Sequence, residues 1–166
     1  MSDSIIYTRE GALARLTFNR PASLNAMGFE MGQRWRDLAH EVTGDDSVGA
    51  ILIDAAGPAF CAGGDVIEMS TSGSSGGDVT AMADTIHDGI RTLVSSDKPI
   101  VAAVQGAVAG GGEREFALGQ GMQGLDLSRD DADDELAAVA RQQCLEHAAG
   151  RKAERRGVRR DELHAA

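Results

Sequence analysis

Apolar and polar positions alternate with a period of two at the start of the chain. Two apolar stretches, 5–7 and 13–18, flank the turn-forming pair Glu10-Gly11, which is the pattern of a β-hairpin. In the second stretch, Leu16 and Phe18 fall on one face. Asn19-Arg20-Pro21 ends the strand, because proline has no N–H to donate to a ladder.

Two later segments carry the helical period. Apolar residues recur at every third or fourth position in 28–42 and again in 82–93, so each segment is predicted to be a helix with one buried stripe. The second helix ends near Pro99, since the residue before a proline disfavours the helical conformation. The stripe residues are Met31, Trp35, Leu38 and Val42, then Met82, Ile86, Ile90 and Leu93.

Short continuous apolar runs at 50–53 and 100–104 follow the two helices, as expected for strands covered on both faces. This order predicts right-handed crossovers, a largely parallel sheet and an α/β fold. Glycine-rich loops, 56–65 and 105–112, follow the two runs, and ligand sites favour that end of a strand. The Ser/Gly-rich segment 70–78 is predicted to be a mobile loop.

The pattern changes after Gly112. An acidic stretch, 128–135, precedes a predicted helix at 135–147, and six of the ten residues in 151–160 are basic. Such a charge run is most often a solvated helix or a frayed tail. We therefore expect a core at 1–118 and an acidic-then-basic helical tail at 119–166, for which oligomerisation is one role.

Composition narrows the classes of partner. The net charge of −10 argues against nucleic acid, because a phosphate backbone needs an organised positive surface. Cys61 and Cys144 lie far apart without metal-ligand spacing, so neither a disulfide framework nor a zinc site is expected. The chain starts without an export pattern and lacks a run of about 18 apolar residues. A cytoplasmic protein without a membrane span is expected.

Three ordered segments carry a family resemblance over about the first 112 residues. They are Leu16–Pro21 with Leu24–Met27, Ala59–Val66 with Glu68-Met69, and Lys98–Gly106 with Gly110-Gly111-Gly112. In these segments the chain resembles the enoyl-CoA hydratase/isomerase (crotonase) superfamily, which implies the N-terminal part of a ββα superhelix, truncated or rewritten after the last segment. The implied ligand is an acyl-CoA thioester, with coenzyme A as part of the substrate and no other cofactor or metal.

Reactions beside a thioester carbonyl build negative charge on its oxygen, and two fixed peptide N–H groups can stabilise that charge. The resemblance assigns these N–H groups to Gly64 and Gly111. It assigns the surrounding substrate-binding positions to Ala26, Ala62, Gly63, Asp65 and Gly110. Taken alone, Asp65 is better interpreted as a helix N-cap than as a functional acid.

The proton-transfer groups of the family pattern are not found. The position of its first glutamate holds Arg114, which stays protonated and cannot act as a base. The neighbouring Glu113 and Glu115 are the candidates, although a helix would point each of them elsewhere. The later segment that carries the second glutamate is not recognisable.

Two classes of function remain. One is an enzyme of fatty acid metabolism that hydrates or isomerises enoyl-CoA, a lyase or an isomerase. The alternative is a catalytically silent binding or assembly protein, or a truncated product. Loss of the last strand and helices would expose apolar strands and an unpaired edge, so a homo-oligomer is expected, a trimer or hexamer by resemblance. Cys61 is expected to be buried, and the four histidines are expected to be isolated surface or core residues.

Overall fold

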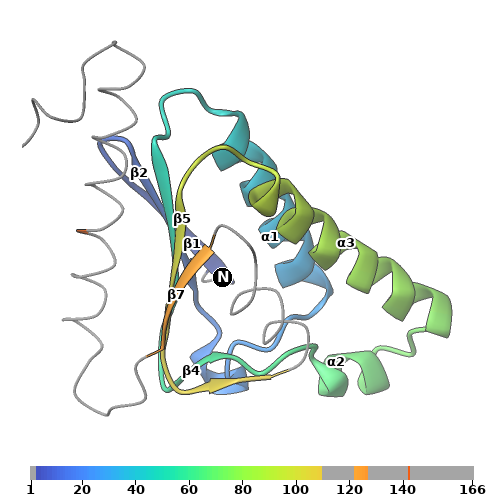
Figure 1. Ribbon diagram of the computed structural model, residues 1–166. Helices are drawn as coiled ribbons and strands as arrows, with labels where there is room; N and C mark the ends of the chain where they lie inside the picture. Colours follow the sequence, from blue (N-terminus) through green and yellow to red (C-terminus); the bar gives the residue numbers. More distant parts are fainter. Residues whose placement is uncertain (1–2, 110–121, 127–141, 143–166) are drawn as a thin grey trace, which may run out of the picture.

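The computed structural model describes residues 3–109, 122–126 and 142. Five strands of this part form one sheet in the order β1-β2-β3-β5-β7 (Figure 1). The first two form the expected antiparallel hairpin, and the later pairings, β2–β3, β3–β5 and β5–β7, are all parallel. The strands are β1 (Ile5–Glu10), β2 (Leu13–Phe18), β3 (Ala50–Ala55), β5 (Ile100–Val104) and β7 (Met122–Asp126).

Two helices, α1 (Phe29–Gly44) and α3 (Gly76–Val94), lie on the same side of this sheet (Figure 1). Trp35 of α1 is fully buried, and its ring meets that of Phe18 edge-on with centroids 5.5 Å apart. The two helices approach closely at Gly89, where an added Cβ would lie 2.6 Å from Trp35 Nε1. The apolar stripes predicted for both helices therefore form the core.

The other face of the sheet is apolar and buried at β3 and β5. Leu52, Val101 and Ala103 are at most 5% exposed, although they project away from α1 and α3. An ion pair between Arg15 and Asp54 lies on this face, with Nε and Oδ2 2.7 Å apart. The expectation of exposed apolar strands is therefore wrong for β3 and β5, whereas Ile6 of β1, on the same face, is 39% exposed.

Strand β7 corrects the expectation of an unpaired edge at β5. Its five residues pair in parallel with Ile100–Val104, so the segment after the glycine-rich loop contributes a further strand. Sequence reasoning placed these residues in a helical tail. The predicted helix at 135–147, except Gln142, and the basic run at 151–160 lie outside the described residues.

Shorter elements join these layers at one end of the sheet. The 3₁₀ turn η1 (Pro21–Ser23) follows β2, and β4 (Ala59–Cys61) pairs in parallel with β6 (Ala107–Val108). Gly106 precedes β6 with φ +61°, and an added Cβ there would collide with the carbonyl of Pro58. Only glycine allows the two chain segments to cross so closely.

Two predicted loops are partly ordered into elements. Residues 56–65 contain β4, and α2 (Val66–Thr71) overlaps the start of the predicted loop 70–78. Helix α3 begins at Gly76 because Ser75 and Asp78 form a reciprocal capping box, which satisfies N–H groups of the first turn. No helix in the described part of the chain is long and apolar enough to cross a membrane.

Candidate functional site

The segment after β2 makes a tight turn held by a buried amide. Leu24 and Asn25 have positive φ angles of 49° and 56°, a conformation that asparagine tolerates better than most residues. The Asn25 side chain is fully buried and donates to the carbonyls of Ala56 and Ala59 at 2.9 and 2.8 Å. Its Oδ1 accepts the Arg20 N–H at 2.7 Å. The turn is therefore fixed against the loop that leads into β4.

This turn lies beside the first glycine-rich loop. The Ala62 N–H donates to the Leu24 carbonyl at 3.0 Å, and the Met27 N–H donates to the Gly63 carbonyl at 2.8 Å. The Asp65 N–H returns to the Met27 carbonyl at 2.9 Å, which completes a parallel bridge between Met27 and Gly64. Two of the three segments that carry the resemblance are thus joined by their backbones.

The bridge fixes the direction of the Gly64 N–H. A trans peptide group is planar, with its C=O and N–H pointing in opposite directions. The Gly63 carbonyl points at Met27, so the Gly64 N–H of the same peptide points away from Met27. Gly64 is exposed, and no described residue accepts a hydrogen bond from its N–H. An oriented, accessible main-chain donor is the result.

Asp65 caps α2 immediately after this donor. Its Oδ1 accepts the Glu68 N–H at 3.0 Å, and its Oδ2 accepts Arg20 Nη2 at the same distance. The Glu68 N–H, and to a smaller extent Arg20, hold the pKa of this carboxyl below its usual value. The N-cap interpretation of Asp65 is confirmed, and an ionised side chain bound in this way is not a proton donor.

The third segment runs along β4. The Ala109 N–H donates to the Cys61 carbonyl at 3.0 Å, so the second glycine-rich loop is bound, just before Gly110, to a residue three positions before Gly64 in the chain. Gly110, Gly111, Glu113, Arg114 and Glu115 lie outside the described residues. Their predicted roles therefore stay predictions.

Cys61 is the last residue of β4. Cys61 is buried as expected, and burial raises the pKa of its thiol. Ala26 and Ala62, which precede the Met27–Gly64 bridge in their two segments, are half-buried, and Gly63 is buried. Their assignment to substrate binding stays a prediction. The described residues contain no cluster of side chains able to hold a metal ion.

These joined segments coincide with a family match. The family model for enoyl-CoA hydratase/isomerase matches residues 13–114, which is more than half of the chain. The chain belongs to the enoyl-CoA hydratase/isomerase family. That match extends from β2 through the turn at Asn25 and the Gly64 loop to Arg114.

Relatives of known name agree with membership of the enoyl-CoA hydratase/isomerase family. The chain is 31% identical over 121 residues to a 1,2-epoxyphenylacetyl-CoA isomerase of Escherichia coli, covering 72% of this chain and 46% of the relative. It is 32% identical over 111 residues to a short-chain-enoyl-CoA hydratase of Clostridium acetobutylicum, covering 66% and 42%. The chain thus spans less than half the length of these relatives.

Solved structures show the same fold. The enoyl-CoA hydratase of Mycobacterium smegmatis superimposes with a TM-score of 0.58 at 27% identity, over 62% of this chain and 40% of that one. The protein AtuE of Pseudomonas aeruginosa superimposes with a TM-score of 0.66 at 27% identity, over 74% and 48%. The predicted α/β crotonase-like architecture of the N-terminal part is confirmed.

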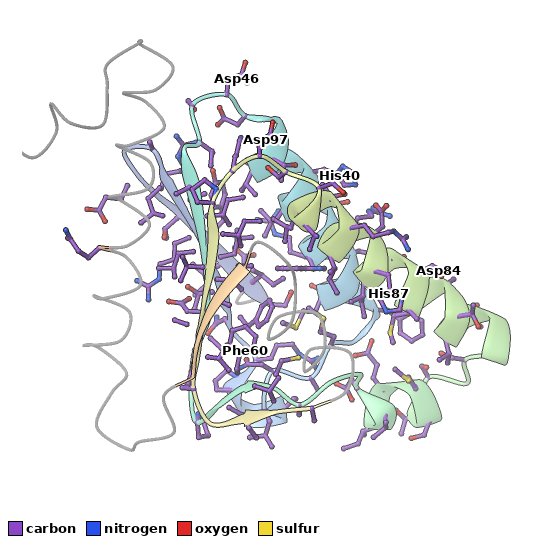
Figure 2. The ribbon with its side chains drawn as sticks, in the orientation of Figure 1. His40, Asp46, Phe60, Asp84, His87 and Asp97 are labelled. Carbon is purple, nitrogen blue, oxygen red and sulfur yellow. The ribbon has the colours of Figure 1, made fainter. Side chains whose placement is uncertain are left out.

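Sequence reasoning missed the side chains that organise this candidate site. Arg20 and Glu68 were quoted only as parts of motifs, and their contacts with Asp65 and Phe29 span 45 and 39 positions. His40 is a surface residue, as expected, but its Nε2 lies 2.9 Å from Asp88 Oδ2. His40 and His87 belong to the α1–α3 layer, whereas Phe60 lies at the level of β4 (Figure 2). The described histidines thus lie on the two long helices and not on the Gly64 loop.

Proposed function

We propose that this chain binds acyl-CoA thioesters and stabilises the negative charge of a thioester enolate, as in hydration or isomerisation of an enoyl-CoA. The Gly64 N–H is one donor to the thioester oxygen, and the Gly111 N–H is the second. The observation that carries this proposal is the orientation of the Gly64 N–H, which points away from Met27 and bonds to no described residue.

A donor of this kind suits the chemistry. A fixed N–H needs no reorganisation as charge develops on the oxygen, and the loss of one such donor lowers kcat by about 10²–10³-fold. Ala26 and Ala62 lie on either side of the bridge, so their main chains can line the path of the coenzyme A part. No cofactor besides this part of the substrate is needed.

The second donor and the proton-transfer groups follow Ala109 in the chain. Two residues span at most about 7 Å, so Gly111 is within reach of the Cys61 end of β4, where Ala109 is bound. Glu113 and Glu115 are the candidates for moving protons. Assembly into a homo-oligomer belongs to the same proposal, because it is implied by the resemblance.

One sequence observation favours a second function. Arg114 occupies the position at which the resemblance expects a glutamate, and a guanidinium binds an anionic ligand but cannot remove a proton. A silent acyl-CoA-binding protein would keep the Gly64 donor and lack turnover. Calorimetry with crotonyl-CoA and a hydration assay, carried out together, separate these two functions.

The deciding experiment compares Gly64→Pro with Gly64→Ala. Both add a side chain, and within the described part of the chain an added Cβ meets only the end of the flexible Met69 side chain, at 2.8 Å. Only proline removes the N–H. We expect the alanine variant to retain binding and any turnover of crotonyl-CoA, and the proline variant to lose about 10²-fold or more. Circular dichroism checks that both variants fold.

Equal behaviour of the two Gly64 variants would remove the oxyanion role. Glu113→Gln and Glu115→Gln test proton transfer separately: loss of turnover with retained binding supports an enzyme. Binding without turnover in the unaltered chain supports the silent protein. A failure to bind any acyl-CoA contradicts both.

A further inference from the structure

Arg20 holds the Gly64 loop from both sides. Its Nη1 donates to the Ala26 carbonyl at 2.6 Å, and its Nη2 donates to Asp65 Oδ2 at 3.0 Å. The side chain is 28% exposed, and its backbone N–H is held by Asn25. One guanidinium therefore bonds both to the turn that precedes Met27 and to the residue that follows Gly64.

Hydrogen bonds in series connect this guanidinium with the Gly64 N–H. The Ala26 carbonyl, which accepts Arg20 Nη1, belongs to the same peptide group as the Met27 N–H. That N–H donates to the Gly63 carbonyl at 2.8 Å, which in turn belongs to the same peptide group as the Gly64 N–H. The series runs through two peptide groups, and the second of them carries the exposed donor.

Such a series strengthens its last donor. A cation at a carbonyl draws electron density from the peptide group and makes the N–H of that group a better donor, and cooperative strengthening is roughly 10–30% per bond. The charge of Arg20 is permanent, because arginine is not deprotonated in proteins. The effect therefore acts at every pH at which the chain is folded.

The Asp65 contacts fix the remaining freedom of Gly64. The peptide group after Gly64 donates to the Met27 carbonyl at 2.9 Å, and the Asp65 carboxylate is held by Arg20 and by the Glu68 N–H. Glycine otherwise has the widest backbone freedom of any residue. With both flanking peptide groups bonded, the direction of its N–H is set.

We propose that Arg20 is a positioning residue that aims and polarises the Gly64 N–H, and thereby strengthens its hydrogen bond to the carbonyl oxygen of a bound acyl thioester. This inference rests on the function proposed above. Arg20 does not touch the thioester; it acts through the peptide groups at Ala26–Met27 and Gly63–Gly64.

The test uses Arg20→Gln, which keeps an amide donor and removes the charge. Arg9→Gln is the matched control, since Arg9 pairs with Asp45 at the C-terminal end of α1 at 2.8 Å, away from Gly28 at its start. In the full chain, the ¹H–¹⁵N spectrum reports the Gly64 amide without ligand. The ¹³C shift of crotonyl-CoA labelled at its thioester carbonyl reports polarisation of the bound ligand.

In Arg20→Gln we expect the Gly64 amide proton to move upfield and the downfield shift of the bound carbonyl to shrink. Crotonyl-CoA should bind about two- to fourfold more weakly, because the lost polarisation is a fraction of one hydrogen bond, whereas free coenzyme A, which lacks the acyl oxygen, should bind as before. Arg9→Gln should match the unaltered chain. An unchanged Gly64 amide in a folded Arg20→Gln chain overturns the inference.

Two further results separate the possible failures. If the unaltered chain binds no thioester, the proposed function is wrong, yet the Gly64 amide still reports the effect of Arg20. If Arg20→Gln does not fold, Arg20→Met removes the charge and the donors but keeps a side chain of similar length. A Gly64 amide that is unmoved in that variant overturns the inference as well.

Discussion

The Glu68 carboxylate accepts the Phe29 N–H at 3.0 Å, so a side chain of α2 caps α1. The N-cap residue of α1, Gly28, has no side chain for this role, and a Cβ there would overlap the Glu68 carboxylate. A negative group at a helix N-terminus is favourable. The contact ties the helix that follows Asp65 to the first turn of α1.

The first prediction concerns this cap. Glu68→Ala and Gly28→Ala should each lower the free energy of unfolding by about 1 kcal/mol, one by loss of the cap and the other by a clash. The double variant should cost less than the sum, because removal of Glu68 also removes the clash. Urea unfolding of the four proteins measures this coupling, and strict additivity would contradict it.

The second prediction concerns the helix contact at Gly89. An added Cβ would lie 2.6 Å from Trp35 Nε1 and 3.2 Å from the Arg36 backbone, so Gly89→Ala should destabilise the chain by about 1–3 kcal/mol through overpacking. Gly77→Ala in the same helix meets only Ser75 Oγ at 3.5 Å and should be neutral or stabilising. Thermal unfolding compares them; a neutral Gly89→Ala would show that the two helices can separate freely.

Hairpin, helix and strand predictions hold where one buried face imposes a period on the sequence. Trp35 and Leu38 belong to such a stripe, and so do Leu16 and Phe18. Strands β4, β6 and β7 have two to five residues each, too few to display a period, and their partners lie far along the chain. The start of α3 was detectable, since Ser75 and Asp78 have capping-box spacing, but the surrounding glycines favoured a loop.

The third prediction concerns Asn25. Alanine at this position would leave the Ala56 and Ala59 carbonyls and the Arg20 N–H without their partner, at a cost of about 3 kcal/mol or more. Asn25→Gly allows the positive φ but loses the same bonds, so it should recover only the part due to backbone strain. Chemical unfolding of both variants separates strain from hydrogen bonding. Equal stability of the unaltered chain and Asn25→Ala would contradict the role of this amide.

The fourth prediction is a pH dependence. Because folding lowers the Asp65 pKa from its model-peptide value of 3.8, the folded chain binds fewer protons than the unfolded chain. This stabilisation is complete above the unfolded value and is lost as pH falls through the folded one. The stability difference between the unaltered chain and Asp65→Asn should therefore shrink below pH 3.8.

The stability of the two proteins must be compared at each pH, since other carboxyl groups also titrate in the same pH range. Hydrogen bonds from Ser47, Ser75 and His40 lower the pKa values of Asp45, Asp78 and Asp88 respectively. These groups are present in both proteins, so their contributions cancel. A stability difference between the two proteins that is constant from pH 6 to 2 would show that Asp65 acts only through its shape and not through its charge.

Sequence motifs located the candidate site but not its internal support. The order of the three segments placed Gly64, and the N-cap role of Asp65 followed from the helix start after it. The bond from Arg20 to Asp65 spans 45 positions, and no local pattern encodes such a pairing. The register of Met27 against Gly64 likewise follows from the fold of the whole layer.

Because the Gly64 donor is part of the main chain, its strength as a hydrogen-bond donor depends on the amino acids at other positions. An amino acid exchange at 64 that spares the N–H can leave the donor intact, whereas an exchange at 20 can weaken it without altering the glycine motif. Screening of related chains for the proposed donor should therefore weigh position 20 beside the motif itself. A search that uses only the glycine motif would include chains in which the Gly64 donor is weakened.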